Sequence, residues 1–326
     1  MKKRIFAACV AALTFSAVAP AADDAASYPS RPIRVIVPFD PGGGVDVLTR
    51  AVGAELSERW GQPFVVENKP GAGSMIGAEA VASAPADGYT LLATVNPTMV
   101  GNRFLFKKLP YDPDKDFTPV VMMVRADQLV LANAGLPADT LKEAVALARA
   151  KPGTLTFGSY GNGSQPHLLF EIINEREGLD LLHVPYKGIT PNLTALAAGE
   201  VNLGSGSVAV ARPLLEAGKI KALAVAADSR VAQYPDVSTT VEQGLPYVKA
   251  SIWYALFAPA GTPPAIVKKI HADVKAILSD PAFAEKHAVA KGLTVVAGDG
   301  AALRKAIDDE VAGTAEMVKA AGVQPE

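Results

Sequence analysis

The chain contains 326 residues, of which 49% are hydrophobic and 20% are charged, and its formal net charge is −2. This length accommodates two domains with cores of ordinary size. Lys and Arg number 31 against 33 Asp and Glu, so no basic excess exists that would favour nucleic acid as a partner. The four histidines are scattered without metal-ligand spacing, so we expect neither a metal site nor a cofactor.

The first residues have the pattern of a secretory signal peptide. Residues 2–4 are basic, residues 5–18 form an apolar run too short to span a bilayer, and Ala19-Pro-Ala21 is a small-residue cleavage site. We therefore predict a signal peptide over 1–21, cleavage near Ala21 and a periplasmic protein. The remaining chain would have no cysteine and a net charge of −5, from 28 basic and 33 acidic residues.

The first predicted strand leads into a glycine-rich turn. Ile33–Val37 is apolar and β-branched, and Val45, Leu48, Val52 and Leu56 then recur at helical spacing. The unpaired amides at the start of such a helix lie at the positive end of its dipole and bind anions. No basic or hydroxyl side chain occurs in the turn, which indicates binding rather than nucleophilic attack. The candidate ligand contacts in this turn are Phe39, Pro41, Gly42, Gly43, Gly44 and Asp46.

Asp46 has two interpretations at this stage. An acidic residue in the first turn of a helix caps free amides and offsets the dipole. Alternatively, the carboxylate orients a ligand or meets a ligand amine. Rossmann-type dinucleotide binding is disfavoured, because Gly42-x-Gly44 is followed by Val47 where the fingerprint requires glycine.

Strand-like runs alternate with helical patterns along the rest of the chain, which predicts an α/β architecture. Thr140-Leu-Lys-Glu143 is a capping box that opens a helix, and Thr262 is the expected N-cap of another. The further predicted strands are Phe64–Glu67, Thr90–Thr94, Val120–Val124, Leu129–Ala132, Thr154–Gly158, Leu182–Val184, Leu203–Ser205, Ala222–Ala226 and Tyr254–Ala258.

Two polar, turn-rich regions, residues 98–119 and 228–248, suggest the domain organisation. We predict a discontinuous first domain, 28–125 plus 229–326, and a second domain, 126–228. The chain then crosses between lobes twice, with hinges expected near 124–128 and 226–230. Small ligands commonly bind between two such lobes.

A second candidate anion loop follows the strand that ends at Gly158. Its candidate ligand contacts are Ser159, Asn162, Gly163 and Ser164. Two helix N-termini, one in each lobe, would hold the two ends of a dicarboxylate. Thr94 and Asn96 end another strand, where α/β sheets often contact ligands. Tyr186 is either a core aromatic residue or a wall of the site.

Seven motifs in order resemble the substrate-binding proteins of tripartite tricarboxylate transporters, also called the Bug family. They begin at Pro38, Glu67, Pro85, Leu109, Gly158, His183 and Trp253 and cover essentially the whole mature chain. The resemblance implies a two-lobed periplasmic binding protein fold, similar to type II. It also implies that backbone amides and waters of 39–46 hold one carboxylate, faced by 159–164 and by the region of Tyr186 and Gly188.

The family resemblance further implies delivery of a small organic acid to the permease subunits of a membrane transporter. Residues 202–207 depart from the family pattern, so we expect Ser205 to line the specificity-determining end of the site. We expect a monomer that has no catalytic activity. Two alternatives remain: a ligand sensor for a two-component system, and a secreted hydrolase that uses Ser159 or Ser164.

Overall fold

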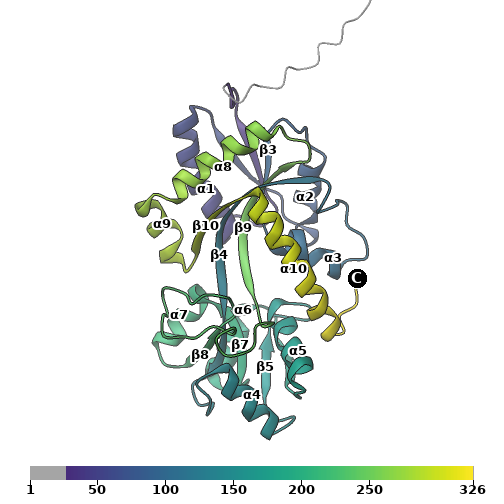
Figure 1. Ribbon diagram of the computed structural model, residues 1–326, viewed down its shortest axis with the longest axis vertical. Coiled ribbons are helices and arrows are strands. Elements are labelled where there is room, and N and C mark those ends of the chain that lie inside the picture. Colours follow the sequence, from purple (N-terminus) through teal and green to yellow (C-terminus); the bar gives the residue numbers. More distant parts are fainter. Residues whose placement is uncertain (1–26, 326) are drawn as a thin grey trace, which may run out of the picture.

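The structure is a computed structural model that describes residues 27–325, so the predicted signal peptide lies outside the described residues. The fold is α/β with two lobes, one above the other in Figure 1. None of the described helices combines the length and the apolar character that crossing a membrane requires. The strands are β1 Ile33–Val37, β2 Phe64–Asn68, β3 Thr90–Val95, β4 Phe117–Asn133, β5 Thr156–Ser159, β6 Leu182–Pro185, β7 Leu203–Ser207, β8 Ile220–Val225, β9 Ser251–Pro259 and β10 Thr294–Asp299.

Helices precede or follow most of these strands. They are α1 Gly44–Trp60, α2 Met75–Ala82, α3 Asn102–Leu105, α4 Leu141–Ala150, α5 Gln165–Glu177, α6 Ile189–Ala198, α7 Val208–Glu216, α8 Pro264–Leu278, α9 Pro281–His287 and α10 Gly300–Ala320. Short helical turns occur at η1 Ala72–Ser74, η2 Pro97–Gly101 and η3 Val289–Lys291.

All the predicted strands are present, with two corrections. The runs 120–124 and 129–132 belong to the single 17-residue strand β4. Strand β10, which pairs antiparallel with β4, was not predicted. The polar residues Arg125 and Asp127 interrupt the apolar pattern of β4, but their side chains form an ion pair with each other within the strand.

Strand β4 belongs to both sheets. In the first sheet, β1, β2 and β3 are parallel, and β9 lies antiparallel between β3 and β4. In the second sheet, β5, β6 and β7 are parallel, and β7 and β8 both pair antiparallel with β4. One extended segment of backbone therefore joins the two lobes.

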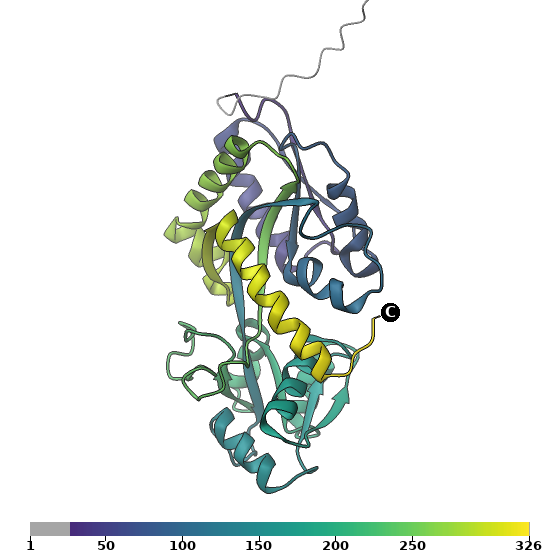
Figure 2. The same cartoon turned by 45° about the vertical axis from the view of Figure 1, so that its right-hand side comes forward.

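Both sheets are buried on their two faces. Successive residues of a strand point to opposite faces, so neighbouring residues pack in different clusters. In the first lobe, Val35 packs in the cluster with residues of α1 and α8, whereas Ile36 packs in the cluster with residues of α2 and α10. In the second lobe, Val130 packs with α4 and α5, and Leu131 packs with α6 and α7. Helix α10 runs diagonally from the first lobe and ends beside α5 of the second (Figure 2).

The chain crosses between the lobes where three backbone segments meet. The Gln128 amide donates to Ala250 O at 3.0 Å, and Ala226 donates to Gln128 O at 2.9 Å. Leu245 and Val248 pack in the second lobe, although the sequence assigned 229–250 to the first domain. We therefore propose that the second crossing lies near residue 250 rather than 228.

Two predicted caps have different outcomes. The capping box of Thr140 and Glu143 is confirmed, with both reciprocal hydrogen bonds present. The prediction for Thr262 is wrong, because helix α8 begins at Pro264 with Pro263 as its N-cap. The Thr262 hydroxyl instead donates to Pro259 O at 2.8 Å, closing the turn that precedes the helix.

Candidate ligand-binding site

Strand register places two sets of loops opposite each other. Val95, the last residue of β3, pairs with Tyr254, which pairs in turn with Val124 of β4. Four residues further along β4, Gln128 pairs with Ser207, the last residue of β7. Four residues of strand span about 13 Å. The loops after β1, β2 and β3 therefore lie across this short distance from the loops after β5, β6 and β7.

The loop after β1 presents free amides at the start of α1. Val47 is the first residue of the helix whose amide bonds to a preceding carbonyl, Gly43 O, at 2.9 Å. The residues from Pro41 to Gly44 are exposed. The amides of 44–46 have no hydrogen-bond partner within the described chain and lie at the positive end of a 17-residue helix.

The buried Asp46 carboxylate stabilises this loop through hydrogen bonds. Its carboxylate accepts hydrogen bonds from the Gly42 amide at 2.9 Å, from Asn68 Nδ2 at 3.0 Å and from Arg50 Nε at 3.0 Å. Burial alone would raise the pKa of Asp46, but the hydrogen bonds from Arg50, Gly42 and Asn68 outweigh it and lower the pKa. The side chain is 3% exposed and bonds Gly42 of the turn rather than an amide of α1, so it stabilises the turn and leaves the helix amides uncapped.

Asn68 connects the same loop to the neighbouring strand. Its Nδ2 also donates to Phe39 O at 3.0 Å, and its Oδ1 accepts from Arg50 Nη2 at 2.7 Å. Phe39 itself is partly buried against the core of the first lobe. No local sequence pattern indicates Asn68 or Arg50. Arg50 contacts the loop through Asp46, and Asn68 contacts it both through Asp46 and at Phe39 O.

Thr94 and Asn96 lie at the end of β3, and both are buried. The Thr94 hydroxyl is 2.6 Å from that of Thr98, which is 2.8 Å from the Ser74 hydroxyl. Asn96 Nδ2 donates to Ser251 O and to the Glu310 carboxylate, while its Oδ1 has no partner within the described chain. These two side chains thus connect β3 to η2 and to α10.

The loop after β5 is hydrogen bonded to two histidine side chains. Ser159 Oγ lies 2.6 Å from His183 Nε2, and the Gly163 amide donates to His167 Nδ1 at 3.0 Å. The two imidazole rings stack with centroids 4.1 Å apart. Burial lowers the pKa of both histidines, and His167 contributes to lowering that of His183 to about 4. Both rings are therefore neutral at pH 7.

The other predicted contacts of the second lobe differ in exposure. Asn162 is exposed, and the Ser164 hydroxyl donates to Gly161 O at 2.6 Å. Tyr186 and Gly188 follow β6, and Tyr186 is partly buried against the cluster of α6 and α7. Ser205 is fully buried, with Gln165 Oε1 3.4 Å from its hydroxyl.

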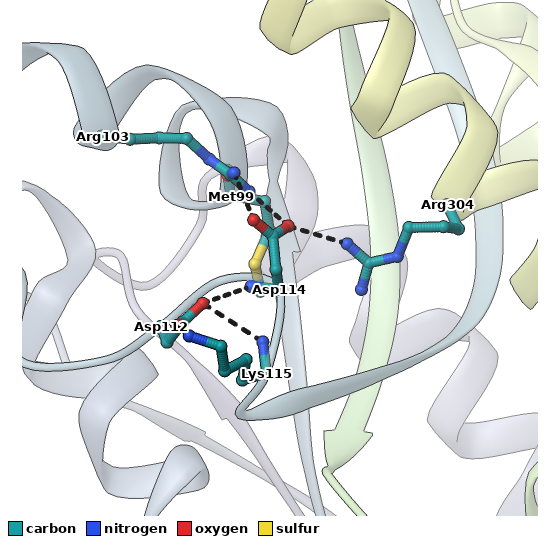
Figure 3. A network of polar contacts seen from close by, with 6 residues as sticks. All are labelled: Met99, Arg103, Asp112, Asp114, Lys115 and Arg304. Atoms are coloured by element: carbon teal, nitrogen blue, oxygen red, sulfur yellow. Dashed lines mark hydrogen bonds and ion pairs between the residues drawn. The ribbon is translucent and has the colours of Figure 1, made fainter.

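The two lobes touch along the side of α3 and α10. A Cβ placed on Gly163 would lie 3.2 Å from Leu105 Cδ2, at the end of α3. Arg176 of α5 pairs with Glu316 of α10 at 2.6 Å. Asp114 joins these two first-lobe helices, since it pairs with Arg103 of α3 and with Arg304 of α10 at 2.6 and 2.9 Å (Figure 3).

A second contact between the lobes lies at the start of α7. Gly292 approaches so closely that a Cβ placed on it would lie 2.9 Å from Ala209 N. Its φ of +72° is in the left-handed region that favours glycine. No sequence pattern indicates this contact, because its two residues are distant in the chain.

Catalytic and metal chemistry find little support in these residues. Ser159 and His183 are hydrogen bonded, but Ser159 is fully buried, and no carboxylate of the described chain is bonded to His183. Over residues 27–325, the acidic, histidine and cysteine side chains form no group of three suited to a metal ion. The arrangement instead offers amide donors at the start of α1, on an edge that faces the second lobe.

Comparison with known proteins gives a consistent result. The family model described as "Tripartite tricarboxylate transporter family receptor" matches residues 48–323. Protein BugT of Bordetella pertussis is 36% identical over 313 residues, which are 95% of this chain and 95% of BugT. A UPF0065 protein in the tcbD-tcbE intergenic region of a Pseudomonas species is 37% identical over 286 residues, which are 87% of this chain and 84% of that protein.

Solved structures of similar proteins share the fold. Rpa4515 of R. palustris with adipate has a TM-score of 0.74 and 34% identity, covering 92% of this chain and 100% of that one. MatC of Rhodopseudomonas palustris with bound malate has a TM-score of 0.68 and 34% identity, covering 89% and 100%. A TctC solute-binding protein from Polaromonas has a TM-score of 0.79 and 28% identity, covering 90% and 99%.

Proposed function

This chain belongs to the tripartite tricarboxylate transporter receptor family and is a solute-binding protein rather than an enzyme; from that premise we propose that it captures a small carboxylate outside the cytoplasm and delivers it to the permease of a tripartite transporter. Similar proteins were solved with adipate and with malate. The proposed ligand class is accordingly the dicarboxylates of four to six carbons.

The observation that carries this proposal is the exposed start of α1. The amides of 44–46 are free, Pro41 to Gly44 are exposed, and no basic side chain lies in the turn. Helix amides bind a carboxylate through dipoles, without the full charge of a lysine or arginine. A carboxylate held in this way is released more readily, as delivery to a permease requires.

The second lobe supplies the proposed opposite contact. The loop of Ser159, Asn162, Gly163 and Ser164 precedes α5, while Tyr186 and Gly188 precede α6. The ends of β3 and β7 are four residues apart along β4, which supports a position of these helix starts opposite the start of α1. In the proposed complex they hold the far carboxylate, with Ser205 beneath them.

A thermal-shift series with mono-, di- and tricarboxylates tests the proposal. A ligand present at one hundred times its Kd stabilises the folded protein by about 2.7 kcal/mol, which is readily measured. We expect a dicarboxylate to raise Tm, whereas the corresponding diamide leaves it unchanged. A protein whose Tm responds to no carboxylate would contradict the proposal.

A pair of glycine variants locates the binding site. A Cβ on Gly43 would meet only Asp40 O, at 3.7 Å, and Gly43 has an ordinary φ of −68°. Gly43→Leu should therefore fold normally yet block access to the α1 amides. We expect it to weaken dicarboxylate binding at least about tenfold, or 1.4 kcal/mol.

Gly313→Leu is the matched control, because Gly313 is exposed on α10 with nothing within 4 Å of a built Cβ. It should bind dicarboxylate like the wild-type protein. Equal binding by both variants would remove the α1 turn from the site. For delivery, reconstitution with the two permease subunits should give dicarboxylate uptake that depends on this protein.

A further inference from the structure

The Tyr254 hydroxyl lies at the start of α1. Tyr254 is in β9, far from α1 in sequence, and its hydroxyl lies so close to Gly44 that a Cβ on Gly44 would collide with it. Glycine at position 44 thus makes room for the phenol. This contact places an O–H group beside the free amides of 44–46.

The position of the ring is fixed by the sheet. Tyr254 pairs with Val95 on one side and with Val124 on the other, so its backbone is held between two strands. Its ring is partly buried against the core of the first lobe. The hydroxyl is therefore presented on a rigid element at the edge that faces the second lobe.

Tyr254 is partly buried, and its hydroxyl makes no hydrogen bond within the described chain, so the acceptor for its proton lies outside the chain. Burial raises the pKa of Tyr254, so the phenol keeps its proton and is a donor at neutral pH. Beside a helix N-terminus, where the field favours negative charge, the natural acceptor for this proton is an anion.

We propose that Tyr254 is a specificity-determining residue that donates its hydroxyl proton in a hydrogen bond to the ligand carboxylate held at the start of α1. This inference rests on the proposed function and adds a side-chain donor to the backbone donors. The site prefers an acceptor at this position because the neighbouring α1 amides are donors only, and the phenol strengthens that preference when it donates its proton.

The test compares Tyr254→Phe with the wild-type protein, using adipate and malate as probes in isothermal calorimetry. Phenylalanine preserves the ring and removes only the donor. A hydrogen bond to a charged group contributes enough that its loss should weaken binding about 10- to 100-fold. The Tm of the ligand-free variant should stay close to that of the wild-type protein.

Tyr247→Phe is the matched control. Its hydroxyl donates to Glu177 Oε1 at 2.7 Å, in the second lobe and away from α1. This variant should lose some stability but bind both probes like the wild-type protein. A weakening shared by both variants would indicate a general effect of losing a phenol and would overturn the inference.

The outcomes separate the two proposals. If the wild-type protein binds a dicarboxylate and Tyr254→Phe binds it equally well, the assignment of Tyr254 is wrong and the proposed function stands. If the wild-type protein binds no carboxylate, the proposed function is wrong and the assignment falls with it. Weaker binding by Tyr254→Phe alone supports both.

Discussion

The backbone amide of Gly42 donates to Asp46 Oδ2 at 2.9 Å, across the turn that begins α1. The carboxylate thus stabilises the turn through Gly42 and makes no hydrogen bond to the first amides of α1. Asn68 and Arg50 complete its hydrogen bonds. The turn is therefore shaped before any ligand arrives, which reduces the entropy that binding must overcome.

Replacing Asp46 should weaken both stability and binding. Asp46→Ala removes a buried, charged acceptor, and we expect it to cost about 2 kcal/mol of unfolding free energy. The side chain of the exposed residue Asp40 makes no hydrogen bond within residues 27–325, so Asp40→Ala is the control and should be near neutral. Urea titrations measure both, and equal midpoints for the two variants would contradict this role of Asp46.

The Asp46 contribution should also depend on pH. Its pKa is lowered in the folded state from 3.8. The unfolded chain therefore binds this proton more tightly, so the stabilisation is complete above about pH 4 and is lost as the pH falls through the folded pKa. The stability difference between wild-type and Asp46→Ala should shrink under these acidic conditions.

The histidine pair should make the stability of the second lobe fall at a higher pH than the one at which the Asp46 contribution is lost. The pKa of His183 falls from 6.5 to about 4 in the folded protein. The stability that the neutral His183 contributes to the folded protein is complete above pH 6.5 and is lost as the pH falls towards 4. Over this range the unfolded chain binds the proton and the folded protein does not. His183→Phe preserves stacking on Phe157 and should reduce this loss of stability.

Urea midpoints measured from pH 7 to pH 4 would show the effect of His183→Phe. The lowered pKa of His167 leaves part of the acid dependence in place, so we expect a smaller slope and not a flat profile. Gly313→Leu, the exposed α10 variant, is the control and should retain the wild-type slope. An unchanged slope in His183→Phe would show that this pair does not carry the effect.

Gly292 should limit how closely the lobes approach at the start of α7. Gly292→Ala would place a Cβ 2.9 Å from Ala209 N at a φ of +72°. Gly178 has a similar φ of +61° but nothing within 4 Å of a built Cβ. Gly178→Ala thus incurs only the backbone strain, about 1 kcal/mol, whereas Gly292→Ala also displaces the neighbouring lobe.

We expect Gly292→Ala to unfold at lower urea than Gly178→Ala and to have a larger radius of gyration in small-angle scattering. If the two variants unfold together and scatter alike, the contact between Gly292 and Ala209 does not hold the lobes in position.

The sequence predicted the strands well where burial dominates. Ile33–Val37 is buried on both sides and was found with the correct bounds. Strand β10 was not predicted, because only Ala297 of its six residues is buried and its register with β4 is interrupted. The polar pair Arg125 and Asp127 made one strand resemble two, since their pairing is visible only in space.

The candidate site was predictable to the extent that it is local. Glycine turns before α1 and α5 follow from neighbouring residues in the sequence. Strand register brings Tyr254 and Asn68 to the α1 turn, and contact between the lobes brings Gly292 to the start of α7. No local pattern indicates such contacts. Thr94 was identified by its position at a strand end and Ser205 by the departure of 202–207 from the family pattern. Both side chains are buried, and both hydroxyls have hydrogen-bond partners within the chain.

The continuity of β4 has a consequence for how this protein tolerates insertions and deletions. Successive residues of a strand point to opposite faces, so removing one residue between the two sheets would invert every β4 side chain in one of them. Val130 and Leu131 would exchange the cores into which they pack. Length changes should therefore be tolerated in surface loops and excluded from residues 117–133, where deletion of one codon would turn the β4 side chains of a whole lobe to the wrong faces.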